Sequence, residues 1–151
     1  MAIVRSAVIS DIPRILDLYR QLTITTSPAE SGIDPTEEDF RSILTRIKAV
    51  PGLELLVAEE GAELVGSLML LIVPNLSHKG LPWALIENVI VDKCCRRNGV
   101  GLQLMQYAIN RAREAGCYRV GLSSDNRRKE AHEFYRSLGF EPSATGFRMS
   151  L

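Results

Sequence analysis

The stretch from Ile86 to Leu102, IENVIVDKCCRRNGVGL, contains residue types that bind anions at a point where a strand ends and a helix begins. Its first part, Ile86 to Val91, is rich in β-branched residues and predicts a strand. Apolar residues then recur at helical spacing, so we expect a helix that starts at about Gly99. The first turn of a helix has backbone N–H groups without intrahelical partners and carries the positive end of the helix dipole. It therefore stabilises an anion.

Two glycines and two arginines surround this predicted helix start. Gly99 and Gly101 leave out the Cβ atoms that would hold a pyrophosphate away from the N–H groups, and Arg96 and Arg97 add positive charge. This pattern predicts a pyrophosphate cradle, although taken alone it also fits a surface turn with solvated arginines. A dinucleotide-binding fingerprint would need a third glycine where Leu104 stands, and a P-loop would need Gly-Lys-Ser/Thr.

A second pattern lies downstream, in the stretch NRRKEAHEFYRSLGF from Asn126 to Phe140. The spacing Arg96-x-x-Gly99-x-Gly101 and this stretch resemble, in the expected order, motifs A and B of the GNAT superfamily of acyl-CoA-dependent N-acetyltransferases. The chain before Leu22 resembles the first strand and helix of that family. The resemblance implies an α/β fold of the GNAT type, with a mixed, mostly antiparallel central sheet flanked by helices on both faces.

The resemblance also implies that acetyl-CoA is the acyl donor. The backbone from Arg97 to Leu102 would hold its pyrophosphate, and the strand residues from Val89 to Val91 would hydrogen-bond its pantetheine arm. The amide of Asn126 is suited either to bind that arm or to cap the following helix. The expected cofactor-binding residues are Val89, Ile90, Val91, Arg96, Arg97, Asn98, Gly99, Val100, Gly101, Leu102 and Asn126.

Acetyl transfer to an amine makes three chemical demands on such a site. The amine must lose a proton, because a typical primary amine has a pKa of about 10.4. Glu87 is the candidate base, because it is a charged residue in an otherwise apolar strand and partial desolvation would raise its pKa. The alternative is that Glu87 is a solvent-facing carboxylate without a role in the reaction. The oxyanion needs a backbone N–H, which the family pattern places near Val89 or Ile90. The departing thiolate needs a proton, and the resemblance assigns that role to Tyr135, which is otherwise a core aromatic.

The size, charge and cysteine content of the chain limit its function. With 151 residues it has room for one domain, 1–151, and too little for two ordinary ones. Lys plus Arg and Asp plus Glu both number 18, so we expect no nucleic-acid partner. The absence of a long apolar run predicts no membrane insertion. Three cysteines without zinc-site spacing fit free thiols in the cytoplasm and predict no metal.

The rest of the chain alternates between strand and helix patterns. Strands are expected over residues 3–7, 53–59, 63–73, 83–92, 118–122 and 147–151, with polar loops over 23–35 and 74–82. A helix capped near Ser10 follows the first strand, and a second begins at Thr36 with Asp39 in the reciprocal capping position. The first helix is expected to bury Ile12, Ile15, Leu16, Tyr19 and Leu22.

These patterns together predict an N-acetyltransferase that moves an acetyl group from acetyl-CoA to a primary amine by direct attack on the thioester. The stretch from Arg128 to Tyr135 is similar to that of family members that act on small amines, such as aminoalkylphosphonate and aminoglycoside acetyltransferases. We therefore expect a small-molecule acceptor. A protein or peptide N-acetyltransferase and a CoA-binding module without turnover are the alternatives. The sequence leaves both a monomer and a homodimer open.

Overall fold

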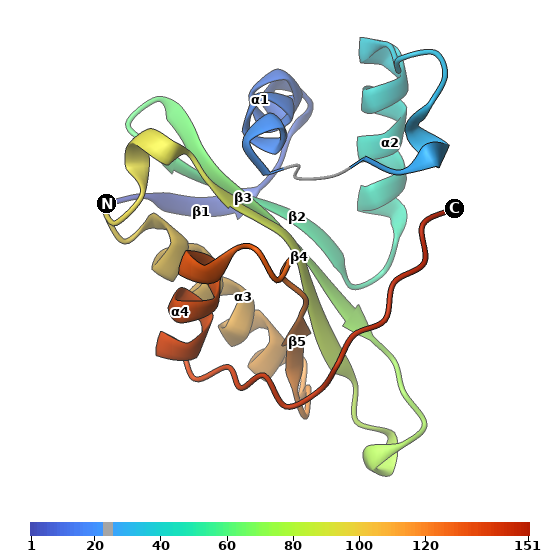
Figure 1. The fold of residues 1–151 in the computed structure, drawn as a ribbon, viewed down its shortest axis with the longest axis vertical. Helices are drawn as coiled ribbons and strands as arrows, with labels where there is room; N and C mark the ends of the chain where they lie inside the picture. The colour runs from blue at the N-terminus through green and yellow to red at the C-terminus, as the bar shows by residue number, and fades with distance from the viewer. Residues whose placement is uncertain (23–25) are drawn as a thin grey trace.

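A five-stranded sheet runs through the centre of the molecule (Figure 1). The computed structural model describes residues 1–22 and 26–151. The strands lie in the order β1-β2-β3-β4-β5; neighbours from β1 to β4 are antiparallel, whereas β5 is parallel to β4. Their bounds are β1 Ile3–Ser6, β2 Leu53–Glu60, β3 Glu63–Val73, β4 Trp83–Val91 and β5 Val120–Leu122. The prediction of a mixed, mostly antiparallel sheet is confirmed.

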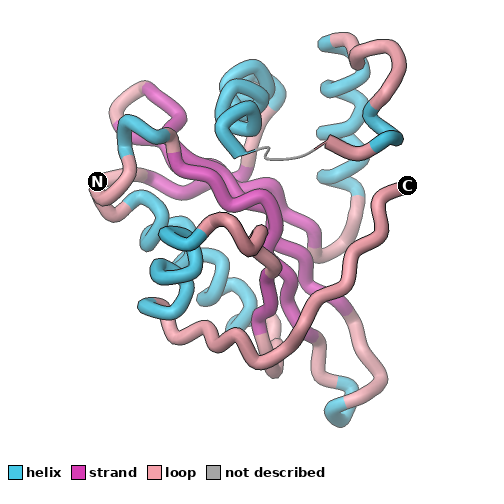
Figure 2. The backbone as a smooth tube through the Cα atoms, in the orientation of Figure 1, coloured by secondary structure: helices cyan, strands magenta, loops and turns pink. Residues whose placement is uncertain are grey.

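Helices lie on both faces of this sheet, as predicted (Figures 1 and 2). Helices α1 and α2 pack on one face, and α3 and α4 pack on the other. Their bounds are α1 Ile12–Leu22, α2 Glu37–Ala49, α3 Val100–Glu114 and α4 Lys129–Ser137. Short 3₁₀ turns cover Ile9–Asp11 (η1), Pro28–Glu30 (η2), His78–Gly80 (η3) and Lys93–Cys95 (η4).

Strand β2 shows why the sheet needs cover on both faces. Its central residues, from Leu55 to Ala58, are all buried and apolar. Because successive side chains point to opposite faces, Leu55 and Val57 join the core beneath α1 and α2, whereas Leu56 and Ala58 join the core beneath α3. A continuous apolar run of this kind is typical of a strand that is covered on both sides.

The start of α2 agrees with its sequence signal, whereas the start of α1 does not. Thr36 and Asp39 exchange the predicted reciprocal hydrogen bonds, at 3.2 Å and 2.7 Å. At α1 the prediction of a cap near Ser10 is wrong. Ser10 lies inside the preceding 3₁₀ turn, and the N–H of Val8 donates to the buried carboxylate of Asp11 at 2.8 Å. Asp11 bonds the backbone there as a carboxylate, a stronger acceptor than a serine hydroxyl.

The buried face of α1 also differs in part from the prediction. Ile12 and Ile15 are buried as expected, and Leu18, which the predicted stripe left out, is fully buried. Leu18 follows Ile15 by three residues and therefore lies on the same side of the helix. Leu16, Tyr19 and Leu22 are half-buried at the edges of this face.

Strand β4 separates from β5 partway along its length. The two strands pair only from Ala84 to Ile86 on the β4 side. On its other edge β4 continues to pair with β3 as far as Val91, but the register shifts by one residue at Asn88 and Val89. Asn88 has a φ of 55°, which marks a β-bulge at this point. The end of β4 therefore has one edge without a neighbouring strand.

Two strand predictions near the C-terminal end need correction. Strand β5 begins at Val120, two residues later than expected, although the Tyr118 N–H still bonds the Pro82 carbonyl. The strand predicted over 147–151 does not form. That segment instead runs past β5 toward α2, and the Leu151 carbonyl accepts a bond from the Ala29 N–H (Figure 1). Residues 147–151 pair with no strand, so their alternation of apolar and polar residues does not reflect a place in the sheet.

The predicted loops contain short 3₁₀ turns, η2 in the first and η3 in the second. Residues 23–25 of the first loop lie outside the described part of the chain. No helix within the described residues has the length and apolar character needed to cross a bilayer.

Candidate active site

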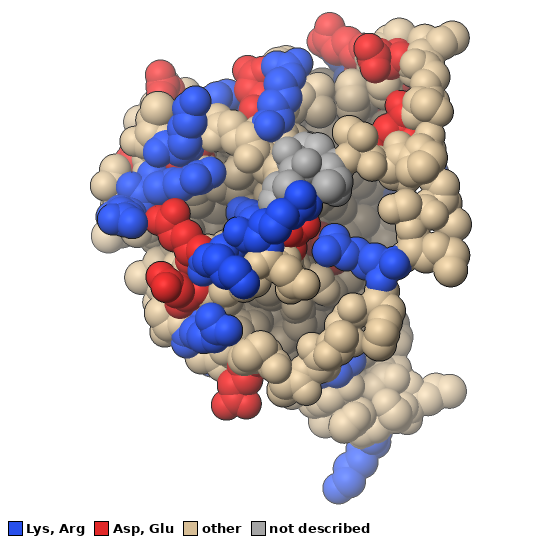
Figure 3. Space-filling view, viewed as in Figure 1, with Lys and Arg blue, Asp and Glu red and all other residues tan. Residues whose placement is uncertain are grey.

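A cleft of about 620 Å³ lies where β4 separates from β5. The end of β4, the start of α3 and the start of α4 form its walls, and the last turn of α1 reaches its rim. Lys and Arg side chains gather on this side of the molecule (Figure 3). The cleft is lined by Gln21, Leu22, Val89, Ile90, Val91, Arg96, Arg97, Gly99, Gly101, Leu102, Arg127, Arg128, Lys129, Glu130, Ala131, Phe134 and Tyr135.

The N-terminus of α3 faces this cleft without a side-chain cap. Gly99 is the N-cap residue, with a φ of 84°, and no acidic residue lies in the first turn. The first intrahelical bond that the N-cap accepts comes from the Gln103 N–H, at 3.0 Å. Helix geometry therefore leaves the preceding N–H groups of the first turn without intrahelical acceptors. A Cβ atom added at Gly99 would meet nothing within 4 Å, so the space in front of these donors is open.

Gly101 lines the cleft and also packs closely against neighbouring elements. A Cβ atom at this position would lie 3.3 Å from Cζ of Phe134 and 3.5 Å from Cγ2 of Val91. Gly101 thus lets the first turn of α3 pack closely against α4 and β4. The preceding residue, Val100, is buried against Gly66 of β3 and does not line the cleft. The absence of a side chain at Gly101 therefore lets the start of α3 lie close to α4 and β4.

The basic residues of the cleft are partly neutralised. Arg97 pairs with Glu130 at 3.1 Å, and Arg127 pairs with Asp125 at 2.8 Å. Hydrogen bonds from Arg127 hold the pKa of Asp125 well below its usual range. The remaining arginines and lysine of the lining give the rim a net positive charge, which favours an anionic ligand.

Backbone groups of β4 also reach the cleft. The Asp92 N–H bonds the Val65 carbonyl of β3 at 2.8 Å, and backbone groups alternate along a strand. Ile90 therefore also faces β3, whereas Val89 and Val91 face the side from which β5 has separated. Arg96 agrees with this assignment, since its Nε donates to the Val91 carbonyl at 3.2 Å. Of the two predicted oxyanion donors, Val89 and Ile90, the strand pattern favours Val89.

Tyr135 lies at the wall of the cleft and is buried in the core of the α3 face. Its ring packs against Phe134 and Phe140. Burial raises the pKa of the hydroxyl, and the nearby charge of Arg128 only partly offsets this effect. The hydroxyl is therefore protonated at neutral pH, as a proton donor must be.

Glu87 does not have the environment expected from the sequence. The expectation of partial desolvation is wrong, because the residue is exposed and is not part of the cleft lining. It pairs with Met69 in the β3–β4 register. Ile86 packs toward α3, so the side chain of Glu87 points to the opposite face, beneath α1 and α2. This part of β4 is covered less than its apolar sequence suggested.

Most of the residues expected to bind the cofactor come together in the cleft. Asn98, Val100 and Asn126 are the exceptions. Asn126 does not cap α4, because the N-cap residue of that helix is Arg128. The sequence did not single out Gln21 and Leu22 as site residues, nor the basic residues at the start of α4. A basic run, RRK, immediately before a helix was the signal for the latter group.

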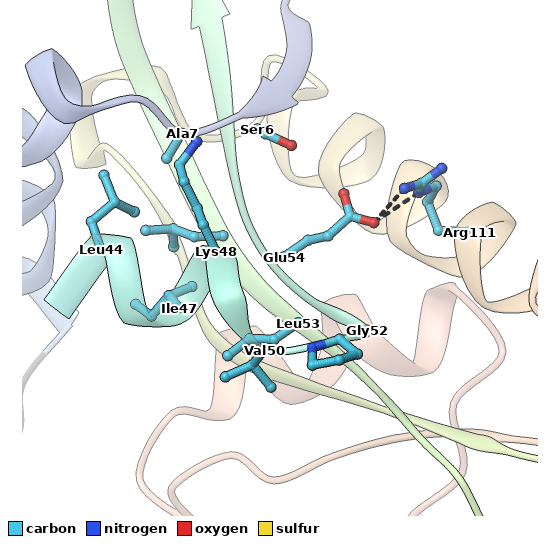
Figure 4. A pocket seen from close by; sticks show the side chains of 12 residues that line it. Ser6, Ala7, Leu44, Ile47, Lys48, Val50, Gly52, Leu53, Glu54 and Arg111 are labelled. Carbon is cyan, nitrogen blue, oxygen red and sulfur yellow. Dashed lines mark hydrogen bonds and ion pairs between the residues drawn. The ribbon is translucent and has the colours of Figure 1, made fainter.

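A second cavity, of about 440 Å³, lies between α2 and β2 (Figure 4). Leu44, Ile47 and Leu53 line it, with the Lys48 side chain along one wall. At its rim, Glu54 is paired with Arg111 at 2.5 Å. None of the predicted site residues lines this cavity.

Comparison with known proteins gives concordant matches. Residues 14–140 match the family described as "Acetyltransferase (GNAT) family". The chain is 30% identical over 146 residues to a glucosamine 6-phosphate N-acetyltransferase of Trypanosoma brucei brucei, covering 94% of this chain and 90% of that protein. It is 30% identical over 102 residues to an aminoalkylphosphonate N-acetyltransferase of Salmonella typhimurium, covering 67% of this chain and 65% of that protein. A solved structure of a putative acetyltransferase from Agrobacterium tumefaciens superimposes with a TM-score of 0.87, at 34% identity and 99% coverage of both chains.

Proposed function

The chain belongs to the GNAT family of acetyltransferases, and we propose that it transfers an acetyl group from acetyl-CoA to the primary amine of a small molecule. One observation carries this proposal: a single cleft combines the uncapped N-terminus of α3, the free edge of β4 and the hydroxyl-bearing ring of Tyr135. The first feature suits a diphosphate, the second an extended amide-containing arm, and the third a leaving thiolate.

The cofactor would enter with its diphosphate at the start of α3. Unpaired N–H groups and the helix dipole favour an anion there, and the glycine N-cap leaves the approach open. Arg96 and Arg128, from two different walls, supply further positive charge. The pantetheine arm would then extend along Val89 and Val91, whose backbone groups form strand-like hydrogen bonds with its amides. Asn126 immediately precedes Arg127, which lines the cleft, and is proposed to reach the same arm.

The reaction proposed for this site is direct attack of the neutral amine on the thioester carbonyl. The new C–N bond forms as the carbonyl oxygen becomes an oxyanion, which the Val89 N–H stabilises by donating a hydrogen bond. The C–S bond then breaks, and the thiolate takes a proton from the Tyr135 hydroxyl. The nitrogen that attacked releases its extra proton to solvent and becomes the neutral amide, and the tyrosinate recovers a proton from solvent. No covalent acyl-enzyme is needed, so the cysteines have no part in this scheme.

Glu87 is the proposed base for the amine. It lies in β4 two residues before Val89, but its side chain is on the face beneath α1 and α2. The acceptor would therefore approach from that face, while the cofactor occupies the cleft on the other. The exposed carboxylate can attract the ammonium form and remove its proton directly or through a water.

The proposed acceptor class is a small amine. The relatives matched over much of this chain are named for glucosamine 6-phosphate and for aminoalkylphosphonates, which are both small molecules with an amine and a phosphorus-containing acid. We propose an acceptor of this general kind, and the cytoplasm as its location because the cysteines are free thiols.

The chain is also proposed to act as a homodimer. Phe147, Met149 and Leu151 alternate along an extended segment and are 93%, 85% and 83% exposed. Large apolar side chains in such a row need cover, and a second copy can supply a strand for pairing. Light scattering on the purified protein tests this: a dimer that Phe147→Ser converts to monomer supports it, and a monomeric parent protein overturns it.

The proposed activity can be tested by incubating the protein with acetyl-CoA and a panel of amines while following the release of free thiol. Amino sugars, their phosphates and aminoalkylphosphonates form one arm, and peptides with a free N-terminus or lysine form the other. Acceptor-dependent thiol release with a small amine supports the proposal. Turnover with peptides alone would indicate a protein acetyltransferase, and coenzyme A binding without turnover on any acceptor would indicate a binding module.

A further inference from the structure

Arg14 of α1 reaches across to a buried carboxylate at the end of β4. Its Nη2 lies 2.5 Å from Oδ2 of Asp92, and its Nε donates to the Leu64 carbonyl at 3.0 Å. Asp92 is only 7% exposed. A buried carboxylate is costly unless it is paired and hydrogen-bonded, so this contact fixes the distance between α1 and the end of β4.

The same carboxylate also holds the turn that follows β4. Asp92 is the N-cap of η4, and its Oδ1 accepts a hydrogen bond from the Cys94 N–H at 2.9 Å. Donation by Cys94 and Arg14 keeps the pKa of Asp92 below its usual value. A second α1 side chain, Gln21, also holds this turn: its Oε1 accepts a hydrogen bond from the Lys93 N–H at 3.0 Å. Two successive backbone groups of the turn are therefore fixed by side chains that belong to α1 or are bonded to it.

This turn leads directly to the anion site. Arg96 and Arg97 follow it, and Gly99 caps α3. Arg97 has a φ of 67°, an uncommon conformation for a residue with a side chain, which persists only where the surroundings fix it. Gln21 itself lines the cleft. Hydrogen bonds thus connect α1 to the turn that leads to the open N–H groups of α3.

We propose that Arg14, Asp92 and Gln21 form a clamp that positions the anion site: α1 holds the turn from Lys93 to Arg97 in the conformation that accepts the diphosphate. The clamp rests on the proposed function for the identity of its ligand. These are positioning residues, because they act on the ligand through the backbone of the turn. The clamp also makes α1 a part of the cofactor site.

The chain contains a matched control for this clamp. Arg5 pairs with Asp11 through two hydrogen bonds, at 2.7 Å and 3.0 Å, and with Glu59 at 2.9 Å. Asp11 is 9% exposed and lies in the turn that leads into α1. This pair is therefore about as buried as the Arg14–Asp92 pair and lies at the same, N-terminal end of α1. None of its residues lines the cleft.

The test compares Arg14→Met with Arg5→Met, using coenzyme A as the probe in calorimetry and thermal unfolding as the measure of stability. Both variants should lower the melting temperature. Only Arg14→Met should weaken coenzyme A binding, by about three- to thirtyfold. With saturating acetyl-CoA its kcat should stay within about twofold of the parent, so the loss appears in KM. Arg14→Lys should recover part of the affinity, and Arg14→Met combined with Asp92→Asn should lose no more than the larger single effect.

Amide hydrogen exchange in the free protein separates the clamp from the proposed function. If the clamp is correct, Arg14→Met speeds exchange at Lys93 and Cys94, and Arg5→Met does not. Equal losses of affinity in the two methionine variants, or unchanged exchange at these two amides, would overturn the clamp. A parent protein that does not bind coenzyme A would instead overturn the proposed function, and the exchange data would still decide whether α1 holds the turn.

Discussion

Helices α2 and α3 begin in opposite ways, although both have the same unpaired N–H groups. At α2, Thr36 and Asp39 bond each other's backbone, and acidic side chains fill the first turn, where they gather in Figure 3. At α3 the N-cap is Gly99, no side chain caps the turn, and Arg96 and Arg97 precede it. The α2 terminus is capped by side chains of the chain itself, whereas the donors of the α3 terminus have no side-chain cap. A missing cap, in a basic cleft, is thus the mark of the candidate anion site.

Making the α3 start resemble the α2 start should have the largest effect. Gly99→Asp places a carboxylate before the open N–H groups, where it occupies the anion site and repels phosphate. Binding of acetyl-CoA should fall below detection in calorimetry, while circular dichroism still reports a folded protein. Gly99→Asn is the matched control, because it has a similar shape and tolerance of positive φ without the charge, and it should keep measurable binding. Equal affinity in the aspartate variant and the parent would refute the cradle.

Tyr135→Phe should separate chemistry from binding within the same cleft. The hydroxyl is proposed to protonate the thiolate and is remote in sequence from the helix start that is proposed to hold the diphosphate. Its loss should lower kcat by about a hundred- to ten-thousandfold and leave the dissociation constant of acetyl-CoA unchanged. Steady-state kinetics with a good acceptor and calorimetry give the two values. Turnover at the parental rate would return Tyr135 to a packing role.

Glu87→Gln should have a smaller, pH-dependent effect. If Glu87 removes the amine proton, kcat/KM should fall mainly on the acidic limb of the pH profile, and less at high pH, where more of the amine is already neutral. If the carboxylate only attracts the ammonium form, KM should rise while kcat stays nearly intact. Acetyl-CoA affinity is unaffected in either case. A variant that matches the parent at every pH would remove Glu87 from the site.

Removing the α2 cap should affect stability alone. Thr36→Ala deletes the hydroxyl that accepts the Asp39 N–H, and such substitutions cost about 1 kcal/mol. Thermal unfolding should show this loss, and calorimetry should show an unchanged acetyl-CoA affinity. If the variant weakened acetyl-CoA binding as much as it lowered stability, the two helix starts would not be independent.

The smallest expected effect is the pH dependence of the same cap. Hydrogen bonds from the Thr36 N–H and hydroxyl keep the pKa of Asp39 below its ordinary value of about 3.9. The stability that this carboxylate adds is therefore present above pH 3.9 and is lost as the pH falls through the lower folded value. The difference in melting temperature between the parent and Asp39→Asn should shrink as the pH falls below the ordinary carboxylate pKa. A difference that stays constant to lower pH would contradict this.

Local signals in the sequence predicted both helix starts. Thr36 and Asp39 are three residues apart and hydrogen-bond each other directly, so their spacing was sufficient. Gly99 likewise sits at the boundary between two clear patterns. Most strands and helices along the chain followed from patterns that extend over several residues, and the mixed sheet with helices on both faces followed from the family resemblance.

Features that depend on distant partners were not predictable in the same way. Arg14 and Asp92 are 78 positions apart, and neither has a local pattern that points to the other. The exposure of Glu87 depends on which strands and helices cover β4, and the alternation of residues 147–151 says nothing about whether a partner strand is present. The close approach of Gly101 to Phe134, in α4, is likewise invisible in the sequence.

The central claim is that the open N–H groups of α3, and not those of α2, receive the diphosphate. Amide chemical shifts of the ¹⁵N-labelled protein, recorded during titration with coenzyme A, test it residue by residue. The account predicts large shifts that saturate together at Val100, Gly101 and Leu102, with the amides of Glu37 and Glu38 unchanged. Saturable binding of coenzyme A that leaves the first turn of α3 unshifted would contradict it.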